Sequence, residues 1–228
     1  MPITTVVFDA YGTLFDVAAA ARQAAAEPDF AAIQDSWPIL AEHWRLKQLQ
    51  YTWLRAVSGA HTNFWTVTQE GLDWALEKTG HDGDAALRER LLQLYWELQA
   101  YPEVPDMLAA LKSAGKQTAI LSNGSPDMLD GAVKSAGISE LLDAVLSVES
   151  VGIFKPASVV YDLVTQHFGC TTDEVLFVSS NGWDAAAATG HGFQTGWVNR
   201  AGEPMDRLPW KPAHILKDLT GIPNLSNA

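Results

Sequence analysis

Length, composition and charge narrow the class of protein before any motif is considered. The chain has 228 residues, of which 47% are hydrophobic and 18% charged, so it is long enough for a globular core and is not a disordered protein. Its formal net charge of -12 argues against a nucleic-acid partner, and an anionic ligand must be held by a few local cations. The single cysteine excludes an internal disulfide. The chain starts with a strand in place of a basic and apolar leader, so we expect a soluble, cytoplasmic protein with no membrane partner.

The first predicted strand ends in a carboxylate. Residues 3–8 form an almost unbroken β-branched and apolar run, which is typical of a strand buried on both faces of a parallel sheet. Asp9 follows directly and leads into a turn that contains Gly12. Open α/β sheets place their chemistry at the carboxyl ends of their strands, so Asp9 is a candidate reacting group. The alternative is that Asp9 caps the next segment.

Residues 16–97 have the periodicity of helices and contain no clear strand. One helix is expected over residues 38–57, with Leu46, Leu49 and Trp53 on its apolar face and Arg45 at the edge of that face. A second is expected to end near Gly80, and a third to begin after Asp82 or Asp84. This segment therefore reads as a helical insertion after the first strand.

Strands and helices alternate along the rest of the chain, which favours an α/β fold with a parallel sheet and right-handed crossovers. The expected strands cover residues 117–121, 144–148, 174–178, 194–198 and 213–216. Ser122 and Asn123 end the first of these, and the Ser125-Pro126 pair after them is typical of a helix start. Free backbone N–H groups there would bind an anion, although an ordinary helix cap explains the same pattern.

Polar residues also mark two later positions at the expected sheet edge. Lys155 would keep a nearby carboxylate ionised and oriented, whereas its alternative role is that of a solvated surface lysine. The strand over residues 174–178 is followed by Ser179, Asn181 and Asp184. Asp184 falls in the first turn of a helix, where a carboxylate is favoured electrostatically, or it acts on a water molecule.

Five segments of the chain resemble the motifs of the haloacid dehalogenase superfamily. The first is Phe8-Asp9-Ala10-Tyr11-Gly12-Thr13-Leu14, and the others cover residues 44–55 of the insertion, 121–125, 154–156 and 178–184. The resemblance implies a Rossmann-like core made of residues 1–15 and 98–228, with an inserted helical cap subdomain made of residues 16–97.

Two departures from the superfamily pattern bear on the reaction. Tyr11 stands where the phosphatases carry a second Asp as general acid, and Ser179-Ser180-Asn181 stands where they carry a Gly-Asp pair that helps to bind magnesium. The carboxylates of an oxygen-rich magnesium shell are thus depleted. The resemblance therefore points to the L-2-haloacid dehalogenase branch, which needs neither a metal ion nor a cofactor.

The reaction implied by this resemblance is hydrolysis of a small L-2-haloalkanoic acid to a D-2-hydroxy acid and halide. Asp9 would attack the α-carbon to form an ester, which water then hydrolyses. Lys155 would neutralise and position Asp9. Thr13 and Ser179 would hold Asp9 and Lys155 by hydrogen bonds. Asp184, steadied by Asn181, would orient the water molecule that hydrolyses the ester.

The same resemblance assigns the substrate contacts. The substrate carboxylate is expected on backbone N–H groups at Ala10 and Tyr11 and around Ser122 and Asn123, and the halide at Arg45 with the Asn123 amide. Arg45 alternatively lays its stem along the helix and keeps its charge in water. The expected apolar wall consists of Tyr11, Leu46, Leu49, Phe64 and Trp183, whose alternative role is packing of the cap on the core. Tyr161 matches a tyrosine near the family's site, or it is a packing residue.

Homodimers are common in this family, so we expect a homodimer. The sequence leaves two other functions open. One is a magnesium-dependent phosphatase of the same superfamily, and the other is a non-catalytic binding protein that kept the fold.

Overall fold

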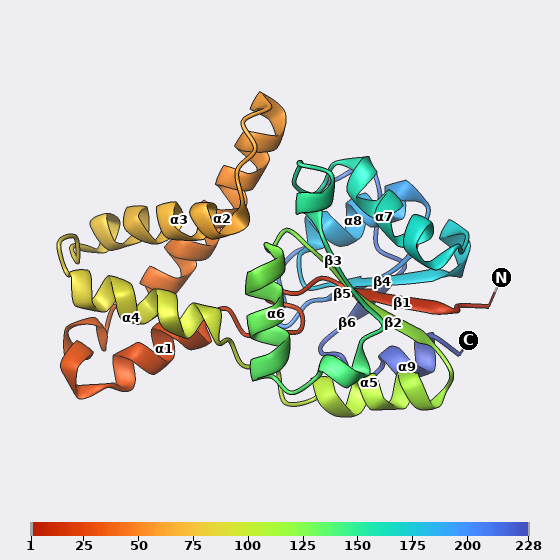
Figure 1. Cartoon of the computed structure of the whole chain (residues 1–228), viewed down its shortest axis with the longest axis horizontal. Helices are drawn as coiled ribbons and strands as arrows, with labels where there is room; N and C mark the ends of the chain where they lie inside the picture. Colours follow the sequence, from red (N-terminus) through yellow and green to blue (C-terminus); the bar gives the residue numbers. More distant parts are fainter. Residues whose placement is uncertain (1, 228) are drawn as a thin grey trace.

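The computed structural model describes residues 2–227 and is built on a parallel β-sheet of six strands (Figure 1). The strand order is β3-β2-β1-β4-β5-β6, and every neighbouring pair is parallel. The strands are β1 (Thr5–Phe8), β2 (Gln117–Ser122), β3 (Ala144–Ser147), β4 (Val175–Ser179), β5 (Gln194–Val198) and β6 (His214–Leu216). The predicted α/β class is therefore confirmed, with the first strand of the chain in the middle of the sheet.

Helices cover both faces of this sheet. Figure 1 shows α5 and α9 on one side and α7 and α8 on the other, with the carboxyl ends of the strands directed toward the cap helices. The helices of this part are α5 (Val104–Ser113), α6 (Pro126–Ser135), α7 (Ser158–Phe168), α8 (Gly182–His191) and α9 (Ile222–Leu225). Short 3-10 turns η2 (Ser139–Leu141), η3 (Val148–Ser150) and η4 (Thr172–Glu174) precede or follow the strands. β1 is buried along its whole length, as its apolar run predicts.

The helices of the insertion pack together beside the sheet and form the cap. They are α1 (Ala19–Ala26), η1 (Pro28–Ile33), α2 (Trp37–Ser58), α3 (Phe64–Thr79) and α4 (Ala85–Trp96). Asp84 accepts a hydrogen bond from the Leu87 N–H at 2.9 Å and so caps α4, as predicted. The chain leaves and re-enters the sheet region at one place, where Phe15 pairs antiparallel with Ala100.

One expectation about α2 is wrong. Its buried face does not contain the Leu46, Leu49 and Trp53 stripe, and Leu46 is 52% exposed. The buried residues of α2 are Leu40, Trp44, Gln48 and Thr52. The Trp44 indole N–H donates to the backbone carbonyl of Thr68 on α3 at 2.8 Å, so contact with α3 selects this face.

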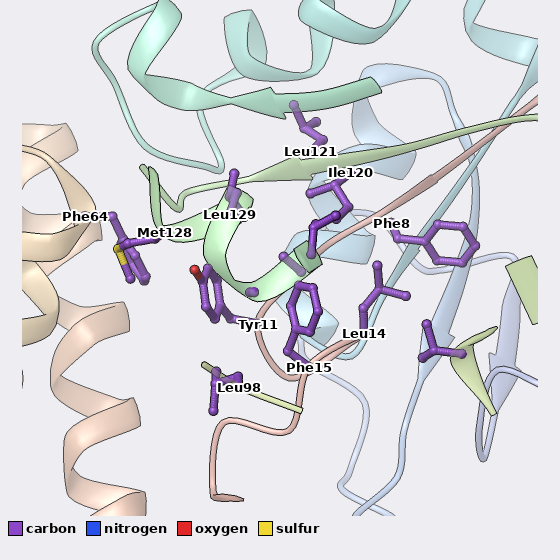
Figure 2. Close-up of a cluster of buried hydrophobic side chains, with 14 of the residues drawn as sticks. Phe8, Tyr11, Leu14, Phe15, Phe64, Leu98, Ile120, Leu121, Met128 and Leu129 are labelled. Atoms are coloured by element: carbon purple, nitrogen blue, oxygen red, sulfur yellow. The ribbon is translucent and has the colours of Figure 1, made fainter. Parts of the chain in front are cut away.

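The strand register brings the predicted strand ends together. Phe8 is level with Ile120 of β2 and with Val178 of β4, so Asp9 follows β1 at the same height as the ends of its two neighbours. The apolar residues around this point, including Leu14 and Phe15, form the core beneath it (Figure 2). The carboxyl ends of the central strands therefore carry a group of polar side chains that faces the cap.

Candidate active site

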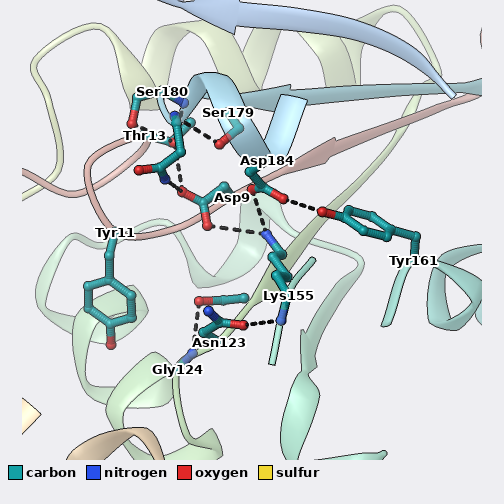
Figure 3. Close-up of polar contacts among 12 residues, drawn as sticks. Asp9, Tyr11, Thr13, Asn123, Gly124, Lys155, Tyr161, Ser179, Ser180 and Asp184 are labelled. Carbon is teal, nitrogen blue, oxygen red and sulfur yellow. Dashed lines mark hydrogen bonds and ion pairs between the residues drawn. The ribbon is translucent and has the colours of Figure 1, made fainter. Parts of the chain in front are cut away.

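Asp9 is held by a hydrogen-bond partner on each oxygen (Figure 3). Its Oδ2 accepts hydrogen bonds from Thr13 Oγ1 at 2.9 Å and from Asn181 Nδ2 at 3.1 Å. Its Oδ1 accepts one from Lys155 Nζ at 3.2 Å. The residue is only 7% exposed, so the carboxylate is oriented and largely removed from water.

Lys155 places its ammonium between two carboxylates. Besides Asp9, its Nζ lies 3.0 Å from Asp184 Oδ2, and the side chain is 1% exposed. The backbone N–H of Lys155 donates to Asn123 Oδ1 at 2.9 Å, which ties the second strand end to this group. A buried ammonium in this position holds both carboxylates by charge-assisted hydrogen bonds. The surface role considered for Lys155 is therefore wrong.

Asp184 is fully buried and has two partners. Tyr161 donates its hydroxyl to Asp184 Oδ1 at 2.6 Å, opposite the Lys155 contact. Burial raises the pKa of Asp184, and the charge of Asp9 adds to this, while Lys155 opposes it. Burial and the charge of Asp184 also raise the pKa of Tyr161 well above its ordinary value, so Tyr161 remains a donor.

The residues at this edge do not fit a magnesium ion, which phosphatases of this fold require. The Lys155 ammonium already pairs with both carboxylates at this end of the sheet, and its positive charge would repel a divalent cation bound to them. Tyr11 supplies a phenol in place of a second acid. Within residues 2–227 no group of at least three His, Cys, Asp or Glu side chains is placed to hold a metal.

Arg45 reaches from the cap into the core. Its Nη2 donates to the backbone carbonyl of Tyr11 at 2.9 Å and to Asn181 Oδ1 at 3.1 Å. Its guanidinium is thus at the site and not in bulk water. A cleft of about 460 Å³ opens here, lined among others by Arg45, Leu49, Ser180, Asn181 and Trp183.

Tyr11 forms an aromatic wall beside Asp9. Its ring is buried, and its centroid lies 5.6 Å from that of Phe64, which comes from the cap. A Cβ on Gly124 would lie only 2.7 Å from Tyr11 Cε2, so the ring can lie there only because this position is a glycine. Cap and core packing and a substrate wall are thus compatible roles for Tyr11 and Phe64.

The structure does not bring every predicted residue to its expected place. Leu46 points away from the cleft, because it is 100° around α2 from Arg45, whereas Leu49 shares the Arg45 face. Ser179 Oγ accepts the Asn181 N–H at 3.1 Å and does not contact Lys155. The Asn181 side chain contacts Asp9 and Arg45, not Asp184.

Other predicted residues have mainly local contacts. Ser122 Oγ accepts the Gly124 N–H at 3.0 Å and so shapes the turn after β2. Ala10 is buried and follows Asp9 directly. Trp183 lines the cleft and packs edge-on against Trp53 of α2 with ring centroids 5.4 Å apart.

Three residues at this site were not predicted from the sequence. Ser180 donates its backbone N–H to Thr13 Oγ1 at 2.8 Å, and its position within the motif at residues 178–184 is a signal for it. Gly124 likewise lies within the motif at residues 121–125. Tyr95 of α4 stacks on Tyr11 with ring centroids 5.7 Å apart, and nothing in its leucine-rich surroundings singles it out in the sequence.

Comparison with known proteins agrees with this geometry. A family model described as haloacid dehalogenase-like hydrolase matches residues 3–192. The chain is 41% identical to (S)-2-haloacid dehalogenase 1 of Pseudomonas sp. (strain CBS-3), over 98% of this chain and 96% of that protein. It is 43% identical to (S)-2-haloacid dehalogenase of Xanthobacter autotrophicus, over 87% of this chain and 76% of that protein.

A solved structure extends the similarity to three dimensions. L-2-haloacid dehalogenase from Xanthobacter autotrophicus with chloropropionic acid covalently bound superposes with a TM-score of 0.88 and 36% identity, over 98% of each chain. The family match covers most of the chain, and the similarity includes both the sheet and the cap. The chain therefore belongs to the haloacid dehalogenase-like hydrolase family, among the L-2-haloacid dehalogenases.

Proposed function

We propose that this enzyme hydrolyses small L-2-haloacids to D-2-hydroxy acids and halide. The observation that carries the proposal is the Lys155 ammonium between Asp9 and Asp184, because it orients the buried nucleophile and places a positive charge beside it. The Xanthobacter autotrophicus relative has been solved with chloropropionic acid covalently bound. By analogy with that complex, we propose that the substrate forms a covalent ester with Asp9.

In the first step an Asp9 oxygen attacks the α-carbon of the substrate. A carbon–oxygen bond forms, and the halide leaves with the electron pair of the carbon–halogen bond. Arg45 supplies the cationic donor for the departing halide, together with the Asn123 amide, whose Oδ1 is already fixed by Lys155. Within residues 2–227, the backbone N–H groups of Ala10 and Tyr11 donate no hydrogen bond to another backbone group in a turn or loop. We assign these two donors to the substrate carboxylate.

In the second step water attacks the ester carbonyl carbon of Asp9. Asp184 orients this water and accepts its proton, a role favoured by the raised pKa of its buried carboxyl group. Tyr161 holds Asp184 through its 2.6 Å hydrogen bond. As the ester carbon–oxygen bond breaks, the leaving alkoxide takes the proton from Asp184 and departs as the D-2-hydroxy acid, and the remaining proton of the new carboxyl group passes to solvent, which restores the Asp9 carboxylate. Thr13, Ser122 and Ser179 act by holding the backbone turns and side chains around Asp9.

The domain boundaries belong to the proposal as well. We assign residues 1–15 and 98–228 to the core and 16–97 to the cap. The Asp16 N–H donates to the Gln99 carbonyl at 3.0 Å, and the Tyr101 N–H to the Leu14 carbonyl at 2.9 Å. These bonds join residues 14–16 to residues 99–101, the two crossing segments between cap and core, and we propose these segments as the hinge between the two parts.

We further propose that the enzyme is a cytoplasmic homodimer. Four large apolar side chains of α2 are exposed, namely Ile39 (42%), Leu46 (52%), Leu54 (57%) and Val57 (90%). They recur along one face of the helix, which suits a second helix from a partner copy, and Val57 also lines a groove with Ile153 and Trp210 of the core. Cys170 is a free thiol, as is usual in reducing compartments. No helix within residues 2–227 is both long and apolar enough to cross a bilayer.

The proposal is tested by incubating the purified protein with L-2-chloropropionate in the presence of a chelator. We expect stoichiometric chloride and D-lactate, and little chloride from the D-substrate. Failure to release halide from any small L-2-haloacid would sink the proposal. Release of phosphate from a phosphomonoester on addition of magnesium would favour the phosphatase alternative.

A further inference from the structure

A buried hydrogen-bond network joins three cap helices behind the active site. Gln48 of α2 donates through Nε2 to Thr68 Oγ1 of α3 at 2.9 Å. The same amide contacts the Tyr95 hydroxyl of α4, with Nε2 at 3.1 Å and Oε1 at 3.2 Å. All three side chains are almost fully buried, at 1%, 0% and 2% exposed for Gln48, Thr68 and Tyr95. We refer to these residues as the cap network.

The cap network touches the groups that surround Asp9. The Tyr95 ring stacks on the Tyr11 ring, with centroids 5.7 Å apart and an interplanar angle of 14°. Arg45 precedes Gln48 by one turn of α2 and donates to the Tyr11 carbonyl at 2.9 Å. Burial raises the pKa of Tyr95, and the positive charge of Arg45 opposes this shift.

Packing alone does not call for polar residues here. The helices around them already bury Leu40, Leu72, Leu87 and Leu91, and an apolar side chain at position 48 would fill the same space with no hydrogen bond to satisfy. A satisfied polar network instead fixes one rotational setting of each helix, because any slip leaves a buried donor or acceptor unpaired. The setting fixed for α2 is the one that directs Arg45 to the site.

We propose that Tyr95, held by Gln48 and Thr68, is a positioning residue that sets the Arg45 guanidinium and the Tyr11 ring around the leaving halide. The inference rests on the proposed function and deepens it. Chloride is smaller and more charge-dense than bromide, and carbon–chlorine cleavage therefore depends more on well-placed donors. Loss of positioning has to slow chloride departure more than bromide departure.

The test compares Tyr95→Phe with wild type on L-2-chloropropionate and L-2-bromopropionate. The substitution keeps the ring and its stacking but removes the hydroxyl. We expect kcat for the chloro acid to fall about tenfold and kcat for the bromo acid about threefold, since small displacements of a positioned group have large rate effects. The bromide-to-chloride ratio of kcat rises accordingly, with KM for both acids within about twofold of wild type.

Three further variants separate positioning from general damage. Thr68→Val cuts the far end of the cap network and is expected to raise the same ratio, whereas Thr68→Ser keeps the hydroxyl and restores it. Tyr51→Phe is the matched control on α2, outside the network, and leaves the ratio unchanged. Thermal melting identifies any variant that fails to fold, and Thr68→Val then provides the measurement in place of Tyr95→Phe.

An unchanged ratio in folded Tyr95→Phe and Thr68→Val, or an equal loss on both acids that follows the fall in Tm, overturns the inference. In that case the proposed function still stands, because wild type releases both halides. If wild type releases neither halide, the proposed function fails and the inference fails with it.

Discussion

A lysine between two buried carboxylates is the residue-level feature on which the site depends. Lys155, Asp9 and Asp184 are all almost completely removed from water, and the single Lys155 ammonium pairs with both carboxylates. A buried ion pair adds little net stability compared with an apolar pair, but removal of one partner is costly because it leaves a buried charge uncompensated. Lys155 therefore determines both the orientation of the nucleophile and the stability of this part of the core.

Lys155→Met tests that statement. We expect kcat for L-2-chloropropionate to fall by at least about a thousandfold and the free energy of unfolding to fall by about 3–5 kcal/mol at pH 7. The control is Lys112→Met, which breaks the half-exposed pair with Asp143 and should cost only about 0–1 kcal/mol. Urea unfolding and halide release measure the two effects, and equal losses in the two variants would contradict the special role of Lys155.

The tyrosines predict how stability depends on alkaline pH. Burial raises the pKa of Tyr11 and of Tyr161 well above 10 in the folded protein. Above pH 10 the unfolded chain therefore releases phenolic protons that the folded chain retains. Because the unfolded state then binds fewer protons, the free energy of unfolding falls as pH rises, by about 1.4 kcal/mol per pH unit for each phenol that stays protonated.

Urea unfolding at pH 9, 10 and 11 measures this fall, and Tyr161→Phe should make it shallower. Phenolate absorbance gives an independent reading, since folded protein should show less ionised tyrosine at pH 11 than unfolded protein. A flat stability profile up to pH 11 would contradict the pKa directions.

At the scale of single elements, the turn after β2 is built to accept the ring of Tyr11. Gly124 has an ordinary backbone conformation, and its importance lies in the missing side chain. In Gly124→Ala the new Cβ lies 2.7 Å from Tyr11 and 3.0 Å from Leu129, so the ring or the turn must shift. We expect about 1–3 kcal/mol of destabilisation and a raised KM for the haloacid.

The control for Gly124→Ala is Gly202→Ala, which has open space around it and a φ of 70°. It should cost about 1 kcal/mol through backbone strain and leave KM unchanged. Denaturant unfolding and KM measured on both variants decide the matter. An unchanged KM in folded Gly124→Ala would show that the Tyr11 ring does not shape the substrate pocket.

Strand ends could be predicted from the sequence, and helix faces could not. Asp9, Asn123, Lys155 and Asp184 each follow a run or motif whose end defines their position, and parallel register then brings them together. Apolar residues are spread around α2, so its own sequence does not show which side meets α3. The hydrogen bond from the Trp44 indole to the Thr68 carbonyl of α3 selects that side. Leu46 was misplaced and Tyr95 was missed for this reason.

At the scale of the whole molecule, cap and core meet around the site, along the crossing segments and where α4 packs against α6. Arg45 of the cap donates hydrogen bonds to Tyr11 and Asn181 of the core. Nε2 of His61 in the cap lies 3.1 Å from Oε2 of Glu149 in the core. The outer face of α2 remains exposed and apolar, as described for the proposed dimer. The same helix thus supplies a site residue on one face and the proposed dimer contact on another.

The dimer is tested by the double variant Ile39→Lys and Val57→Lys. Both side chains are exposed, so the monomer fold should be unaffected while two copies of α2 would repel each other. Light scattering during gel filtration should show a dimer for wild type and a monomer for the variant. The control is Val145→Lys on β3, which is 42% exposed and distant in the chain from α2, and should remain dimeric. A monomeric wild type would refute this part of the proposal.

A single turnover in ¹⁸O-labelled water tests the covalent role of Asp9 most directly. With enzyme in excess over L-2-chloropropionate, the hydroxyl oxygen of the product comes from the Asp9 carboxylate, and water enters at the ester carbonyl carbon. We predict unlabelled hydroxyl oxygen in the D-lactate and ¹⁸O in the peptide that contains Asp9, both read by mass spectrometry. Labelled D-lactate with an unlabelled Asp9 peptide would mean direct attack of water on the α-carbon and would contradict the ester mechanism.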